Sequence, residues 1–283
     1  HLTELLGDLL GAEPAELEPL AELVAVKTGG NPFFCFEFIK ALQRSGLFVF
    51  DHEARRWRWD IERIRAQRMT DNVVDLMMEK LRQLEPPTLA LLQLAACIGS
   101  RFALATLTEV ADLPLPDVQR HLRQAFAEGL ISLPGDLGPN DDVLAVFNHD
   151  RIHQAAYELL DENERRRAHL LIGRRLLRQL PVEGHDEQLF EVVDHLNLGA
   201  ELIDDADERR RLSELDLAAG KRAKQAGAYP QALAYLEKGL ALLGADAWER
   251  AYPLALELHA EAAEAAYLSG RYDAMDRLLA DAF

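Results

Sequence analysis

The sequence predicts a mainly α-helical protein, and three observations support this fold class. Hydrophobic residues make up 49% of the 283 residues, and they are mostly Leu and Ala rather than Val and Ile, a mixture that favours helices over sheets. Apolar residues recur at helical spacing through most of the chain. Runs typical of strands occur at only two places. We therefore expect helical units interrupted by one short hairpin and by the two strands of a winged-helix domain, followed by tetratricopeptide-like repeats.

The first predicted domain, residues 1–84, is expected to be helical with one hairpin. The segment 14–27 places apolar residues at helical spacing, and a Thr-Gly-Gly-Asn run ends it. Pro32 suits the first turn of the next helix, because a proline there gives up no backbone hydrogen bond. That helix is expected to stop at Gly46. Apolar runs on both sides of 51–53 then predict a hairpin.

The second predicted domain, residues 85–160, follows a helix for which Thr70 is the candidate cap. Three helical segments with short joints come first. Apolar strands are then expected at 130–133 and 143–147, with the polar loop 134–142 between them. Three helices followed by a two-stranded wing is the layout of a winged-helix domain.

The remainder is expected to be helical, with a linker at 161–210 and a tetratricopeptide-like array at 211–283. A weak internal repeat supports the array, since Gly227 aligns with Gly270 and similar residues follow both glycines. The period exceeds the roughly 34 residues of a tetratricopeptide unit. Because the second copy stops without a capping helix and the chain starts without Met, we expect a piece of a longer protein.

Charge argues against nucleic acid as the main partner. The formal net charge is -17, and an acidic body of this size repels phosphate backbones. The third helix of the expected winged helix offers Arg120, His121 and Arg123. It also carries acidic residues, so it lacks the basic stripe of a DNA-reading helix. A DNA-binding regulator is therefore disfavoured.

The cellular setting is expected to be the cytoplasm. No apolar run approaches the roughly 20 residues that a membrane helix needs. Cys35 and Cys97 lie among apolar neighbours, so we interpret them as small core residues in a reducing compartment. We expect neither a membrane nor a disulfide.

The stretch 146–157 raises the question of a metal site. His149 and His153 have the spacing of the H-E-x-x-H zinc signature, with Asp in place of Glu. Zinc needs both histidines on one helix. Here the expected strand 143–147 leaves His149 before the helix, off the face that carries His153, and no third ligand follows. Asn148 and Asp150 are the favoured cap types at this helix start. We therefore expect no metal site.

Motifs of a self-sufficient active site are missing from the sequence. There is no G-x-x-x-x-G-K-[ST] loop, no G-x-S-x-G elbow and no Cys/His cluster with zinc spacing. The Gly220-Lys221 pair is followed by Arg and lies within an expected helix. We expect that this segment is not itself an enzyme.

Four stretches in this order, 27–34, 70–81, 92–102 and 147–157, together resemble the signal-transduction ATPases with numerous domains. The resemblance covers nearly the whole chain. It is strongest to the bacterial branch in which such an ATPase is joined to protein kinases with sensor domains. That family orders a P-loop core, a helical lid, a winged helix and helical repeats. This chain resembles the last three, with 1–84 as the lid, so the core would lie upstream.

The resemblance implies a nucleotide contact in the lid. Gly30-Asn31-Pro32 matches the family's G-x-P motif, whose proline packs on the adenine. A rigid proline face at a helix start offers a flat apolar wall, which suits this role. The alternative is that Pro32 only starts a helix.

The resemblance also implies a phosphate contact. Asn148-His149-Asp150 matches the family's Met-His-Asp motif, whose histidine reaches the β-phosphate of ADP and locks the closed resting state. Asn148 departs from the family's Met, which we expect to cost some core packing. The alternative is that His149 only caps or packs. The implied nucleotide-sensing residues are Gly30, Pro32, His149 and Asp150.

Together these observations predict a regulatory segment that senses nucleotide and transmits a signal. ADP or ATP would bind in the parent protein, and this segment alone would bind neither tightly. Expected partners are the upstream P-loop core, neighbouring kinase or sensor domains, and a protein on the helical repeats. The alternative is a helical-repeat scaffold for protein contacts that has no nucleotide role. Discrimination between the two depends on whether a P-loop lies upstream.

Overall fold

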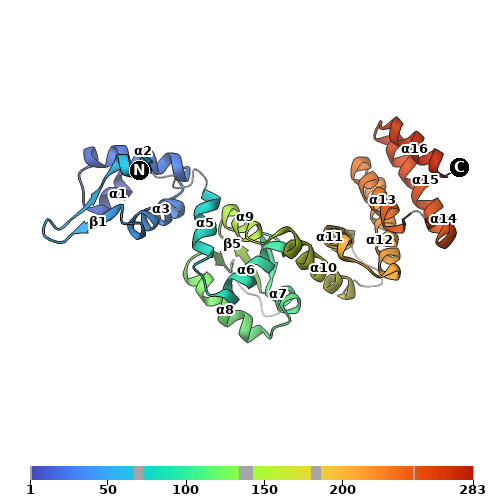
Figure 1. Ribbon diagram of the computed structural model, residues 1–283, viewed down its shortest axis with the longest axis horizontal. Coiled ribbons are helices and arrows are strands. Elements are labelled where there is room, and N and C mark those ends of the chain that lie inside the picture. The colour runs from blue at the N-terminus through green and yellow to red at the C-terminus, as the bar shows by residue number, and fades with distance from the viewer. Residues whose placement is uncertain (1, 67–72, 134–142, 180–185, 245, 283) are drawn as a thin grey trace. The chain divides into compact units, whose positions relative to one another are not determined.

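The computed structural model describes residues 2–66, 73–133, 143–179, 186–244 and 246–282. Its described residues are mainly α-helical, as the sequence predicts (Figure 1). The candidate cap Thr70 and the predicted loop 134–142 lie outside the described residues.

The chain divides into two compact units, which do not follow the order of the sequence. The predicted boundaries at residues 84, 160 and 210 stay predictions. The first unit comprises residues 1–96, 120–136 and 145–159, and the second comprises 97–119, 137–144 and 160–283.

Up to residue 159 the chain forms helices with a few short strands between them; of these elements, β3 and α7 belong to the second unit. The helices are α1 (Leu2–Leu10), α2 (Pro14–Thr28), α3 (Pro32–Arg44), α4 (Ile61–Ala66), α5 (Val73–Leu81), α6 (Pro86–Ile98), α7 (Leu104–Ala111), α8 (Leu115–Ala127) and α9 (Asp150–Glu158). The strands are β1 (Phe48–Asp51), β2 (Arg56–Trp59), β3 (Arg101–Ala103), β4 (Ile131–Ser132) and β5 (Leu144–Phe147).

The predicted hairpin is confirmed. Strands β1 and β2 pair in antiparallel register, with Phe48 opposite Trp59 and Phe50 opposite Trp57. The Phe48 and Trp59 rings stack with their centroids 5.4 Å apart, and cross-strand aromatic pairs of this kind stabilise a ladder. The two strands form a sheet of their own.

Strands β4 and β5 are also antiparallel, with Ile131 opposite Phe147 and Ser132 opposite Val146. The sequence predicts both, although β4 is shorter than expected. It does not predict β3, because three residues between two helices are too few to show an alternating pattern. The assignment as a winged helix stays a prediction.

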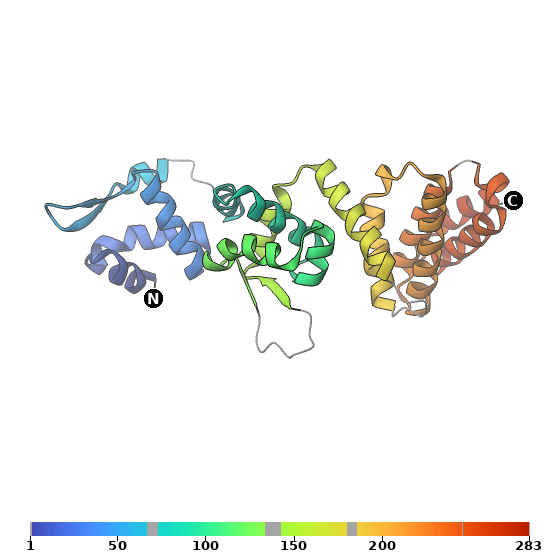
Figure 2. The same cartoon turned by 90° about the horizontal axis from the view of Figure 1, so that it is seen from below.

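The second unit is helical after residue 160, as predicted. In Figures 1 and 2 the four long helices at the C-terminal end, α12, α13, α15 and α16, lie side by side. The helices are α10 (Glu162–Gln179), α11 (Asp186–Leu198), the 3-10 helix η1 (Ala200–Leu202), α12 (Ala206–Gln225), α13 (Tyr229–Leu243), α14 (Ala247–Arg250), α15 (Tyr252–Leu268) and α16 (Tyr272–Ala282).

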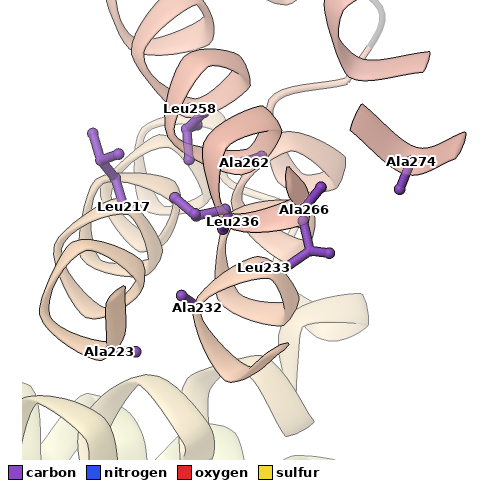
Figure 3. Close-up of a cluster of buried hydrophobic side chains, with 10 residues drawn as sticks. Leu217, Ala223, Ala232, Leu233, Leu236, Leu258, Ala262, Ala266 and Ala274 are labelled. Carbon is purple, nitrogen blue, oxygen red and sulfur yellow. The ribbon is translucent and has the colours of Figure 1, made fainter. Parts of the chain in front are cut away.

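Two helical hairpins, α12–α13 and α15–α16, correspond to the internal repeat. Each turn contains a glycine with positive φ, Gly227 at 77° and Gly270 at 72°. A cluster of buried Leu and Ala residues joins the hairpins (Figure 3). Helix packing is close, since a Cβ added at Gly220 would lie 2.5 Å from Cγ of Leu236. Whether the array is of the tetratricopeptide type stays a prediction.

One buried carboxyl group stands out in this unit. Asp216 on α12 is 0% exposed. The amide of Asn197 donates to its Oδ1 at 2.7 Å, whereas Oδ2 has no hydrogen-bond partner among the described residues. Burial raises the pKa of Asp216 to about 7, against the lowering effects of Asn197 and Lys238.

A pair of buried histidines joins α10 to α11. The Nδ1 atoms of His169 and His195 lie 2.9 Å apart, so one ring donates and the other accepts. Both pKa values are lowered, chiefly by burial, and that of His195 falls to about 4. The pair is therefore uncharged at neutral pH.

Candidate functional site

The start of α3 is built by local chemistry. Gly29 and Gly30 both have positive φ, 63° and 72°, a conformation that glycine adopts without strain. They turn the chain from α2 into α3. Asn31 caps α3, because its side chain accepts a hydrogen bond from the backbone N–H of Phe33 at 3.0 Å. Pro32 is then the first helical residue, as predicted, and it is exposed.

His149 itself caps α9. Its Nδ1 accepts a hydrogen bond from the backbone N–H of Arg151 at 3.1 Å. The sequence predicts Asn148 or Asp150 as the cap, and this prediction is wrong. Asp150 is instead the first residue of α9, and it is exposed. His149 does precede the helix, as expected.

The side chain of Asn148 is occupied elsewhere, which explains why it does not cap α9. Its Nδ2 donates to the carbonyl of Gly129 at 2.8 Å, and its Oδ1 accepts from Ser132. Its backbone N–H donates to the carbonyl of Leu130. Because this side chain is exposed, the expected loss of core packing relative to Met does not arise. Asn148 ties β5 to the turn before β4.

The capping bond fixes the tautomer of a neutral His149. Since Nδ1 accepts from Arg151, the proton must be on Nε2. Among the described residues, no hydrogen-bond partner of Nε2 is found. His149 is only partly buried. The ring therefore carries an N–H donor that is available to a ligand.

The structure brings the two sequence motifs together. The ring of His149 lies edge-to-face against the ring of Phe34, with the centroids 4.4 Å apart and the planes at 70°. Phe34 follows Pro32 by two residues in the first turn of α3. Sequence reasoning did not single out Phe34, although an aromatic pair directly after Pro32 was visible. The start of α3 and the cap of α9 thus form one candidate site, to which Gly30 contributes only its turn.

His153 packs against its own surroundings rather than facing the site. Its Nε2 lies 2.9 Å from the carbonyl O of Ala96, and its ring lies against Phe147 with the centroids 5.3 Å apart. Within the part of the chain that the structure describes, no three His, Cys, Asp or Glu side chains form a group that could hold a metal ion.

The chain is similar to one curated protein, the Hybrid signal transduction histidine kinase G of Dictyostelium discoideum. The two are 29% identical over an alignment of 334 residues, which includes 99% of this chain and 10% of that protein. The chain thus spans about a tenth of the length of this relative. No family model matches the chain, and no solved structure matches it. None of the described helices is long and apolar enough to cross a membrane.

Proposed function

We propose that this chain is the nucleotide-sensing and signal-transmitting segment of a signal-transduction ATPase with numerous domains. The similarity to a hybrid signal transduction histidine kinase supports a role in signalling. The finer assignment rests on the motifs at Gly30, Pro32, His149 and Asp150. In this proposal the segment is not an enzyme itself. An upstream P-loop core binds the nucleotide, and a neighbouring kinase or sensor domain receives the signal.

The observation that carries the proposal is the contact between the two motifs. Phe34 holds the His149 ring beside the start of α3, where Pro32 is exposed. This arrangement presents an apolar wall and an N–H donor from one site. A bound ADP would supply an adenine ring and phosphate oxygens, the two chemistries that match them. Pro32 would line the base, and Nε2–H of His149 would donate to a phosphate.

The surroundings of His149 agree with a single directional donor rather than a strongly basic anion site. The start of α9 supplies the positive end of the helix dipole, while the backbone N–H groups of Arg151, Ile152 and His153 already donate to His149. Asp150 at the first helical position adds a negative charge, which favours the helix start but opposes a phosphate. The proposed phosphate contact would therefore depend on the directional N–H donor of His149 rather than on the net charge of the helix start.

The mechanism is a two-state switch. In the resting state, Pro32 and His149 together close over ADP. Exchange for ATP would remove the contact that His149 makes only in the closed state, and the units would then be free to move. The helical repeats would transmit that movement or bind a protein partner.

The experiment is to express the longer protein that contains this segment and to identify its bound nucleotide. We expect ADP to remain bound to the natively purified protein, and the 283-residue chain alone to bind neither ADP nor ATP at micromolar concentration. If the longer protein binds no adenine nucleotide at millimolar concentration, the nucleotide-sensing proposal is wrong. The repeats would then stand as a protein-binding scaffold.

A further inference from the structure

One lysine near the candidate site is almost completely buried. Lys80, close to the end of α5, is 7% exposed. Its Nζ lies 2.9 Å from Oε1 of Glu37 on α3, whose side chain is 5% exposed. Lysine is rarely buried to this extent without an opposite charge. The ion pair therefore joins α3 to α5, with both charged side chains almost completely buried.

Lys80 has further partners on both sides. The ring of Phe33 in α3 lies beside its ammonium group, with Nζ 5.3 Å from the ring centroid, a distance suited to a cation–π contact. Beyond the end of α8, Lys80 contacts Glu128 through both its backbone carbonyl and its side-chain carboxylate. Nζ is 3.5 Å from its carbonyl O and 3.6 Å from its Oε2. One ammonium group thus contacts α3 and the turn between α8 and β4.

These contacts close a circuit that includes the candidate site. Gly129, the neighbour of Glu128, accepts a hydrogen bond from the side chain of Asn148. The next residue, His149, lies against Phe34 of α3. The contacts that lead from Lys80 through Glu128 and His149 therefore end on α3, the same helix that Lys80 contacts directly through Glu37. Each of its links is a hydrogen bond, an ion pair, a ring contact or a peptide bond.

The charge of Glu37 is maintained despite its burial. Burial by itself raises the pKa of Glu37. Hydrogen bonds from Lys80 and then Lys40 lower this pKa by more than burial raises it, so the net pKa is below its ordinary value. Glu37 is therefore a carboxylate at neutral pH. Lys40 also contacts this carboxylate, at 3.1 Å, but from the same helix and with a side chain that is 59% exposed.

We infer that Lys80 is a positioning residue that clamps the start of α3 against His149, through Glu37 and Phe33 on one side and Glu128 on the other. A buried ion pair is a poor source of stability, because taking the charges out of water offsets most of their attraction. Its use is to specify one geometry among several. The inference rests on the proposed function only in giving this geometry a purpose, which is to keep the site assembled.

The test compares two variants of the 283-residue chain. Glu37→Met with Lys80→Met removes both charges, so that no unpaired charge stays buried and the fold is retained. Lys40→Met is the matched control, because it removes a contact to the same carboxylate without separating two elements. Nitroxide labels at the exposed residues Gln43 on α3 and Glu158 on α9 report the distance between these helices, measured by pulsed electron spin resonance.

We expect the double variant to shift the label distances to longer and more broadly distributed values, while Lys40→Met matches the unmodified chain. The clamp is refuted if the double variant is folded by circular dichroism and keeps the original distances. It is equally refuted if Lys40→Met produces the same shift. The measurement contains no nucleotide. A shift in distance without any change in ADP retention by the longer protein would support the clamp and overturn the nucleotide proposal.

Discussion

Replacing Asp216 by Asn should remove a pH dependence from the free energy of unfolding of the second unit. The folded protein holds the Asp216 proton more tightly than the unfolded chain, because burial raises the pKa from 3.8 to about 7. The group therefore contributes its full stability below pH 3.8, and this contribution is lost as the pH rises to about 7. Above that pH the loss is complete.

The magnitude follows from the shift in pKa. At roughly 1.4 kcal/mol per unit, the shift corresponds to about 4 kcal/mol between the two limits. Asn is close in shape to the protonated acid and can still accept the hydrogen bond from Asn197. Asp216→Asn should therefore match the original protein near pH 4 and be more stable by up to about 4 kcal/mol at pH 8. Every other titrating group is common to both proteins, so the difference isolates Asp216.

The assay is urea unfolding at several pH values between 4 and 8. Fluorescence of Trp248, which packs on His259 in the second unit, follows the transition in a background with Trp57→Phe and Trp59→Phe. Asp273→Asn, at an exposed position on α16, is the control. A stability difference between Asp216→Asn and the original protein that is the same at pH 4 and pH 8 would refute the reasoning.

Two further predictions concern the second unit. The pKa of His195 is lowered from 6.5 to about 4, so its contribution to stability is present above pH 6.5 and is lost as the pH falls to about 4. In urea unfolding, His195→Gln should therefore reduce the loss of unfolding free energy between these pH values by about 3 kcal/mol. An unchanged acid sensitivity would contradict this. Gly220→Ala should lower the free energy of unfolding by about 1–3 kcal/mol, because the added methyl overlaps Leu236. A neutral effect in the same assay would show that α12 and α13 separate easily.

Local chemistry explains the parts of the structure that the sequence predicted well. The start of α3 at Pro32, its end at Arg44 just before Gly46, and the hairpin after it depend on turn glycines, a proline and alternating apolar runs. These act within a few residues of one another. The placement of His149 before α9 was predicted for the same reason, because the preceding strand determined where the helix could begin.

Contacts between distant residues explain what the sequence did not show. Asn148 has a better capping side chain than histidine, but it bonds to Gly129 and Ser132, far away in the chain. His149 caps in its place. The orphan oxygen of Asp216 likewise depends on how α11 and α13 pack around it.

The clamp could have been recognised in part from helical spacing. Lys80 follows the buried Met77 by three residues, and Glu37 follows the buried Phe34 by three residues. Each charge therefore lies on the apolar stripe of its helix. A buried positive charge on one helix and a buried negative charge on another predict a pair. The spacing does not show that Glu128 completes the clamp.

The most direct test of the central claim is the rate of ADP dissociation from the longer protein with His149→Asn. Asn keeps a capping acceptor for α9 but cannot place a donor where Nε2–H lies. A hydrogen bond to a charged group contributes roughly 1.5–3 kcal/mol, so we expect ADP to dissociate about ten- to a hundredfold faster and the signalling output to rise. His153→Ala should leave both unchanged. If His149→Asn releases ADP at the original rate, or if His153→Ala has the larger effect, His149 is only a helix cap.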